Sequence, residues 1–156
     1  MTAIDLTPQL DALRDKYPDW WRKDVALDEL QALWGGTPCN DCGVFNEQER
    51  IDIDLQSDSR WRGTIKITRA LNGWYAVATS YKYALGGGTS PISVWNCTAY
   101  TTRDEAIEAA ALELKRTFEG IRDSKVYTLD SQRETAQRII GQIETFMRQS
   151  RQMTLF

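Results

Sequence analysis

Residues 64 to 83 read TIKITRALNGWYAVATSYKY, two runs rich in β-branched and aromatic residues on either side of Asn72-Gly73. Such a pattern predicts a β-hairpin with a two-residue type I′ turn, in which Leu71 pairs with Trp74. Because successive side chains of a strand point to opposite faces, this register predicts two distinct faces. The expected core face carries Ile65, Ile67, Arg69, Leu71, Trp74, Ala76, Ala78 and Ser80. The other face carries Lys66, Thr68, Ala70, Tyr75, Val77, Thr79 and Tyr81. Residues 92 to 100 (ISVWNCTAY) are apolar enough to form a third strand.

Two amphipathic segments follow the predicted strands. Thr102 and Glu105 form a capping box, which predicts a helix beginning at Arg103, and Gly120 is placed to end it. Apolar residues recur at helical spacing between them: Ile107, Ala110, Ala111, Leu114 and Phe118. A second helix, from 131 to 149, has its apolar side at Ala136, Ile139, Ile140, Ile143, Phe146 and Met147.

The first third of the chain has shorter elements. Thr7-Pro8 favours a helix through Lys16, Val25 to Trp34 reads as another, and residues 50 to 55 (RIDIDL) alternate as an exposed strand would. The predicted fold class is therefore α+β, with a three-stranded antiparallel sheet (β-β-β-α) packed by helices, a helical N-terminal segment and a long C-terminal helix. We expect a single domain over 1–147, with a helical part at 1–60 and the sheet and helices at 61–147, followed by a tail at 148–156.

Composition narrows the class of protein. The chain has 156 residues, 42% apolar and 26% charged, with a net charge of -3, which excludes a disordered tail, a strongly basic nucleic-acid binder and an acidic DNA mimic. No apolar run approaches the ~18 residues of a membrane helix, and MTAIDLTPQL does not resemble a secretory signal, so we expect a cytoplasmic protein without membrane contact. Histidine is absent, which removes Ser-His, Cys-His and most zinc hydrolase schemes. We expect a non-catalytic protein with no cofactor and no small-molecule substrate.

The cysteines and carboxylates leave two alternatives open. Cys39 and Cys42 form a lone Cys-x-x-Cys, and a zinc site there would need Asp41 or a partner chain as well, so reduced thiols are favoured and no metal site is predicted. Asp52 and Asp54, on alternate strand positions, could hold Mg²⁺ in a nuclease. The same alternation is what an edge strand uses to keep a charged outer side. The glycines at 86 to 88 lack the lysine and following helix of a phosphate loop and predict a flexible connector.

Residues 61 to 101 contain four basic residues and no acid. Aromatic residues are interleaved with these cations, a combination typical of surfaces that stack on bases and meet phosphates. The candidate nucleic-acid contacts are Arg62, Lys66, Tyr75, Tyr81 and Lys82. The sequence pI of about 5.1 argues against the strongly positive surface that is typical of nucleic-acid-binding proteins. DNA binding is therefore the alternative function.

The last five residues, Gln152 to Phe156 (QMTLF), resemble the pentapeptide with which bacterial proteins bind the sliding clamp, the β subunit of DNA polymerase III. The family pattern is Gln, an aliphatic residue, Ser or Asp, then Leu-Phe, so Met153 and Thr154 depart from it mildly. In the family, Leu-Phe enters an apolar cleft of the clamp and Gln hydrogen-bonds to a neighbouring subsite. The resemblance implies that Leu155 and Phe156 are anchors and that Gln152 is the polar determinant. It covers five residues and implies nothing about the rest of the chain.

Charge near this motif supports the same partner. Arg148 and Arg151 precede it, and no acid follows Glu144, which suits an acidic partner surface. The alternative is a tail that docks on its own domain through Met153, Leu155 and Phe156. The sequence therefore predicts an accessory or regulatory protein of DNA replication or repair, of bacterial, plasmid or phage origin, whose partner-binding residues are Arg148, Arg151, Gln152, Met153, Leu155 and Phe156.

Overall fold

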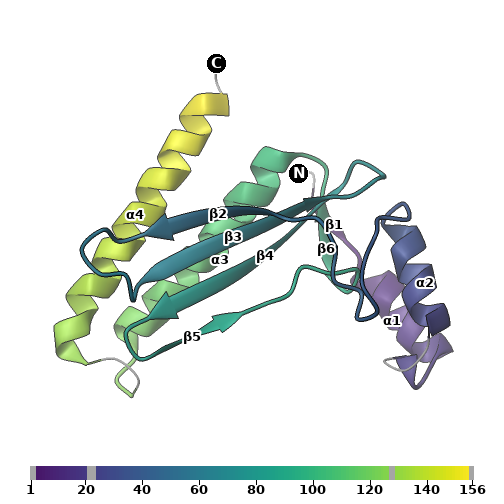
Figure 1. The fold of residues 1–156 in the computed structure, drawn as a ribbon, viewed down its shortest axis with the longest axis horizontal. Helices are drawn as coiled ribbons and strands as arrows, with labels where there is room; N and C mark the ends of the chain where they lie inside the picture. Colours follow the sequence, from purple (N-terminus) through teal and green to yellow (C-terminus); the bar gives the residue numbers. More distant parts are fainter. Residues whose placement is uncertain (1–2, 21–23, 127–128, 155–156) are drawn as a thin grey trace. The chain divides into compact units, whose positions relative to one another are not determined.

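The computed structural model describes residues 3–20, 24–126 and 129–154, with the backbone alone for 153 and 154. Within these described ranges, four helices and six strands follow one another in sequence (Figure 1). Their order is β1 (Ala3–Asp5), α1 (Thr7–Lys16), α2 (Asp24–Leu33), β2 (Glu49–Asp54), β3 (Arg62–Arg69), β4 (Tyr75–Tyr83), β5 (Gly86–Thr89), β6 (Thr98–Tyr100), α3 (Arg103–Asp123) and α4 (Asp130–Thr154). The α+β class is as predicted. Among the described residues, no helix has a stretch long and apolar enough to cross a membrane.

The sheet is larger than predicted. It is antiparallel, with the order β1-β6-β4-β3-β2 and with β5 paired to β4, so the prediction of three strands is wrong. Two short strands were missed: β1 pairs with β6, and the glycine run expected to be a connector is β5, with Tyr81 opposite Gly88. Neither carries a run of β-branched residues, which is the signal used to find strands.

The described chain divides into two compact units, each assembled from three stretches of sequence. The first comprises Met1–Glu49, Ile67–Val77 and Pro91–Ala106. The second comprises Arg50–Lys66, Ala78–Ser90 and Ile107–Phe156.

Trp34 organises the core of the first unit. Its ring is fully buried and meets Phe45 and Trp74 edge-on, with centroids 5.6 and 5.7 Å away. Its indole N–H donates to the carbonyl of Val94 at 3.1 Å, which satisfies the polar atom of a buried aromatic residue. This contact fixes the segment before β6 against α2.

The predicted strand over residues 92 to 100 is wrong for its first six positions. The Asn96 amide N–H donates to the Ser93 carbonyl, and the Ser93 amide N–H donates to Asn96 Oδ1, both at 3.1 Å. The side-chain amide of Asn96 also donates to the carbonyl of Val77 at 2.8 Å. These bonds close a turn, so the chain becomes a strand only at Thr98.

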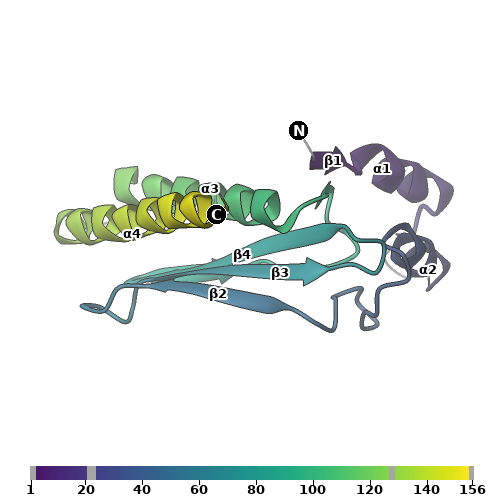
Figure 2. The ribbon, with the colours of Figure 1, turned by 90° about the horizontal axis from the view of Figure 1, so that it is seen from above.

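In the second unit, α3 and α4 lie side by side on one face of the sheet (Figure 2). Polar bridges join every seventh residue of the two antiparallel helices: Glu108 to Arg151 at 2.6 Å, Lys115 to Glu144 at 3.4 Å and Arg122 to Gln137 at 2.7 Å. The apolar residues between these bridges are fully buried: Leu114, Phe118, Ile139, Ile140 and Ile143. A repeat of seven is the spacing at which packed helices keep the same faces in contact.

The helix bounds differ from prediction at their C-terminal ends. The Thr102 hydroxyl accepts from the amide N–H of Glu105 at 3.3 Å, which confirms the predicted cap of α3. That helix nevertheless passes through Gly120 and ends at Asp123, and α4 runs to Thr154 rather than to residue 149. Residues 148–154, predicted as a tail, therefore continue the helix.

The hairpin between β3 and β4 has a three-residue loop. The Ala70 N–H donates to the Trp74 carbonyl at 2.8 Å, and the Gly73 N–H donates to the Ala70 carbonyl at 3.0 Å. Gly73 has a φ of 87°, whereas no described residue other than glycine has a positive φ. A type I′ turn needs a positive φ at both central residues, so the predicted turn, and with it the Leu71–Trp74 pairing, is wrong.

This shift exchanges the two predicted faces of β4, because a one-residue change of register moves side chains to the opposite side of a sheet. The predicted core face of β3 is correct, since Ile65 and Ile67 are buried and Gly63, on the same side, lies against Leu114 of α3. Leu71, expected in the core, is 70% exposed, whereas Ala70 and Thr79 from the other predicted face are buried. Against α3, the Thr79 hydroxyl bonds Glu113 at 3.3 Å, and the Tyr81 ring meets Phe118 edge-on at 6.2 Å.

Gly73→Ala should lower the free energy of unfolding by about 1–2 kcal/mol, because an L side chain at this φ approaches its own carbonyl. A Cβ at this position meets no other atom, so the loss isolates the backbone effect. Urea unfolding measures it. Leu71→Ala in the same loop is the matched control and should change little, and equal losses in the two variants would contradict this account of the turn.

Candidate functional site

Helix α4 leaves the core of its unit before it ends. Ile143 is the last buried residue of α4 among those whose side chains the structure describes, and Phe146 and Met147 are half-buried. Beyond them, Arg148, Gln149, Arg151 and Gln152 are exposed. The last turns of the helix therefore present polar side chains to solvent directly before residues 153–156.

The last polar bridge between α3 and α4 pairs Arg151 with Glu108. The Arg151 guanidinium donates to Glu108 Oε1 at 2.6 and 3.1 Å, with 61% of the Arg151 side chain and 50% of Glu108 exposed. Such an exposed ion pair contributes at most about 1 kcal/mol. Arg148 donates to the Thr145 hydroxyl at 3.1 Å, and the side chain of Gln152 makes no hydrogen bond to any described residue.

Three of the six predicted partner-binding residues lie together. Arg148, Arg151 and Gln152 are spaced three and four residues apart, so they share one face of the helix. The cations stand at the negative end of the helix dipole, which favours them there. The side chain of Met153, and Leu155 and Phe156 entirely, lie outside the described residues.

The five predicted nucleic-acid contacts do not form one surface. Tyr81 is on the sheet face covered by α3, whereas Lys66 bonds Thr89 from the other face. Arg62 shares the face of Lys66, because the two are four residues apart on β3, and it pairs there with Asp54. Lys82 lies on the same face, because it is two residues from Ser80 on β4, and Ser80 also bonds Thr89. Tyr75 belongs to the first unit, where it lines a pocket of about 310 Å³ with Ile67 and Arg69. The predicted stacking platform is therefore not assembled.

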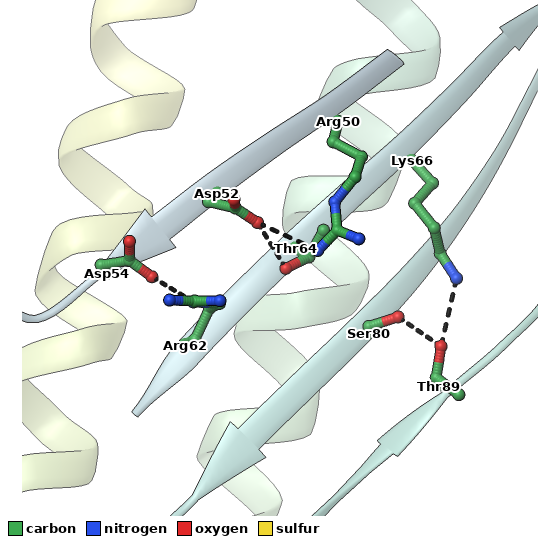
Figure 3. A network of polar contacts seen from close by, with 8 residues as sticks. All are labelled: Arg50, Asp52, Asp54, Arg62, Thr64, Lys66, Ser80 and Thr89. Atoms are coloured by element: carbon green, nitrogen blue, oxygen red, sulfur yellow. Dashed lines mark hydrogen bonds and ion pairs between the residues drawn. The ribbon is translucent and has the colours of Figure 1, made fainter. Parts of the chain in front are cut away.

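On the uncovered face of the second unit, polar side chains form a network across β2, β3, β4 and β5 (Figure 3). Asp54 accepts from Arg62 at 2.7 Å, and Asp52 accepts from the Thr64 hydroxyl at 2.7 Å. The Thr89 hydroxyl lies 2.6 Å from that of Ser80 and accepts from Lys66 at 3.1 Å. Hydroxyl groups thus occupy the middle of the face, and cations lie on both sides of them.

The Lys66 ammonium is partly buried within this network. Partial burial is the main cause that lowers the pKa of its ammonium, and the nearby Arg50 guanidinium lowers it further. Its ammonium is held by the carbonyl of Ser90 as well as by Thr89.

The two metal alternatives find no support in the side-chain geometry. Asp52 and Asp54 are hydrogen-bonded as above, and within the described ranges no three Cys, Asp or Glu residues are grouped to hold a metal ion. All three cysteines are free thiols. Burial raises the pKa of Cys39, with Asp28 adding to it, which makes this thiol less reactive. The Asn40 side chain accepts from the amides of Cys42 and Val44, so the Cys-x-x-Cys segment is a tight turn.

Sequence reasoning missed Arg50 as a surface cation. Its side chain is 60% exposed and lies 3.7 Å from Asp52, on the same face as the other polar groups. The alternation of residues 50 to 55 could have indicated it, because Arg50, Asp52 and Asp54 occupy alternate positions of one strand.

No protein family model matches the chain, and neither the curated proteins nor the solved structures include one that is similar to it.

Proposed function

We propose that this protein is a non-catalytic accessory or regulatory factor of DNA replication or repair that binds the bacterial sliding clamp through residues 152–156. The observation that carries the proposal is the position of the motif relative to α4. The last ion pair of this helix with α3 is at Arg151, and the side chain of the next residue, Gln152, is exposed and makes no hydrogen bond to any described residue. The motif thus begins directly after the last bridge between the two helices, and its first three residues continue α4.

The residues have distinct roles in this proposal. Following the resemblance, Leu155 and Phe156 are the apolar anchors, and Gln152 and Met153 complete the motif. Burying the two anchors contributes ~1.5–3 kcal/mol each, less the cost of ordering the segment, which is compatible with micromolar affinity. Arg148 and Arg151 face an acidic surface of the clamp, and such charges act mainly on the rate and specificity of association.

Binding alone gives the protein a regulatory effect. A chain that occupies the clamp excludes other clients that use the same cleft. It also holds any second surface of the protein close to the clamp, and a weak second contact then becomes intramolecular. The origin that suits such a factor is a bacterial chromosome, a plasmid or a phage.

A pull-down of purified bacterial sliding clamp tests the proposal. The full chain should retain the clamp, and a chain lacking residues 152–156 should retain none, because both anchors are gone. Gln142→Ala, an exposed position of α4 outside the motif, is the control and should bind as the full chain does. Equal retention with and without the five residues would refute the proposal.

A further inference from the structure

The sheet face opposite α3 and α4 in the second unit is polar and carries more positive than negative charge. Figure 2 shows both helices on the other face, and Figure 3 shows side chains on this one, among them Arg50, Arg62 and Lys66. Its cations are Arg50, Arg62, Lys66 and Lys82, and its acids are Asp52 and Asp54. Arg50 and Arg62 are 60% and 46% exposed, so the face is open to a ligand.

The acids of this face are already occupied. Asp54 is held by Arg62 and Asp52 by Thr64, each at 2.7 Å. Arg50 also lies 3.7 Å from Asp52. An incoming anion therefore meets guanidinium and ammonium groups while both carboxylates remain bonded within the sheet. Hydroxyl groups and cations are the side chains that contact phosphate oxygens in nucleic-acid complexes.

Cations lie beside one another at both ends of the face. Arg50 is close enough to Lys66 to oppose its charge. At the other end of the face, the rings of Trp61 and Tyr83 are in contact, with centroids 6.0 Å apart. This contact fits a register in which Trp61 lies opposite Tyr83, and Arg62 on β3 therefore lies opposite Lys82 on β4. Like charges directly opposite each other on a sheet are destabilising, and a bound anion relieves that repulsion.

The two cation pairs suit an extended anion. They are four residues apart along β3, which is roughly 13 Å at about 3.3 Å per residue. A strand of nucleic acid carries a phosphate about every 3.4 Å of helix axis, so a backbone that crosses the face presents charge to both pairs.

We infer that this face, with Arg50, Arg62, Lys66 and Lys82 as its contacts, binds the phosphate backbone of nucleic acid. Tyr81 packs on Phe118 on the opposite, helix-covered face of the sheet, so it is not available here to stack on bases. The proposed contact with DNA therefore tolerates different base sequences. The inference is independent of the clamp proposal, because it uses none of residues 148–156. Together, the two surfaces would hold DNA beside the clamp.

Fluorescence anisotropy with labelled duplex DNA and with single-stranded DNA of the same length tests the inference on the full chain. Plotted as log affinity against log salt concentration, binding should weaken with salt, with a slope of about -0.9 for each phosphate contacted on a duplex. Arg50→Gln with Lys82→Gln should reduce that slope by about 2 and lower affinity at least ~10-fold. Tighter binding of one DNA form assigns the face to that form.

The controls separate this face from general charge and from the clamp motif. Arg116→Gln with Lys125→Gln removes the same net charge from exposed positions elsewhere in the second unit and should change affinity less than ~2-fold. Removal of residues 152–156 should leave DNA binding unchanged. Circular dichroism checks that each variant is folded.

Three results would overturn the inference. They are no salt-dependent binding of either DNA form, an equal loss in the Arg50/Lys82 and Arg116/Lys125 variants, and binding of vesicles of anionic lipid without binding of DNA.

Discussion

Phe118→Ala should lower the free energy of unfolding by about 3–5 kcal/mol. Phe118 is fully buried on α3, and its ring lies against Trp61 and Tyr81, with centroids 6.3 and 6.2 Å away. Gly63 lies directly below α3: a Cβ there would be in ordinary contact with the Phe118 ring at 3.5 Å and closer, at 3.1 Å, to Leu114 Cδ1. Truncation removes apolar burial, two aromatic contacts and the atoms that fill the space.

Urea unfolding followed by far-ultraviolet circular dichroism measures this loss. The matched control is Phe146→Ala on α4, where the same side chain is only half-buried and the loss should be clearly smaller. A Phe118 variant within about 1 kcal/mol of the original chain would contradict the packing of α3 on the sheet described above.

The helices could be predicted because their signals are local. The spacing of Ile107, Ala111, Leu114 and Phe118 places them on one side of α3, and each of them is buried. The predicted C-terminal ends of α3 and α4 were wrong because tertiary contacts override local sequence signals. In α3, the bridge from Arg122 to Gln137 lies beyond Gly120. In α4, the bridge from Arg151 to Glu108 lies beyond residue 149.

The hairpin could be located but its register could not. Asn72 and Gly73 mark the turn, yet Asn72 donates to the carbonyl of Leu33 at 3.1 Å and accepts from the Trp74 amide. The bond from Asn72 to Leu33 joins residues far apart in sequence, so the Asn-Gly pair alone does not indicate it. The resulting shift of one residue separated Tyr81 from Lys66, and the stacking platform expected from composition became two unlike faces.

The candidate site at the end of α4 was predicted from residue types alone. Exposure of Arg148, Arg151 and Gln152 accords with that choice of residues, whereas the partner itself stays a prediction. The pairing of Arg151 with Glu108 depends on the antiparallel alignment of two helices, which spacing along one helix does not reveal.

Leu155→Ala with Phe156→Ala should reduce affinity for the bacterial sliding clamp by at least ~100-fold. The two side chains supply ~1.5–3 kcal/mol each on burial, and a loss of about 2.8 kcal/mol already corresponds to that factor. Arg148→Gln, which alters charge without touching the anchors, should cost less and act mainly on the association rate. Equal losses in the two variants would indicate that charge rather than the apolar pair governs binding.

Calorimetric titration of the sliding clamp with the full chain and with the Leu155/Phe156 double variant tests clamp binding most directly. The account predicts micromolar binding by the full chain and no detectable heat from the variant at ~100 µM. Absence of binding by the full chain at that concentration, or undiminished binding by the variant, would contradict it.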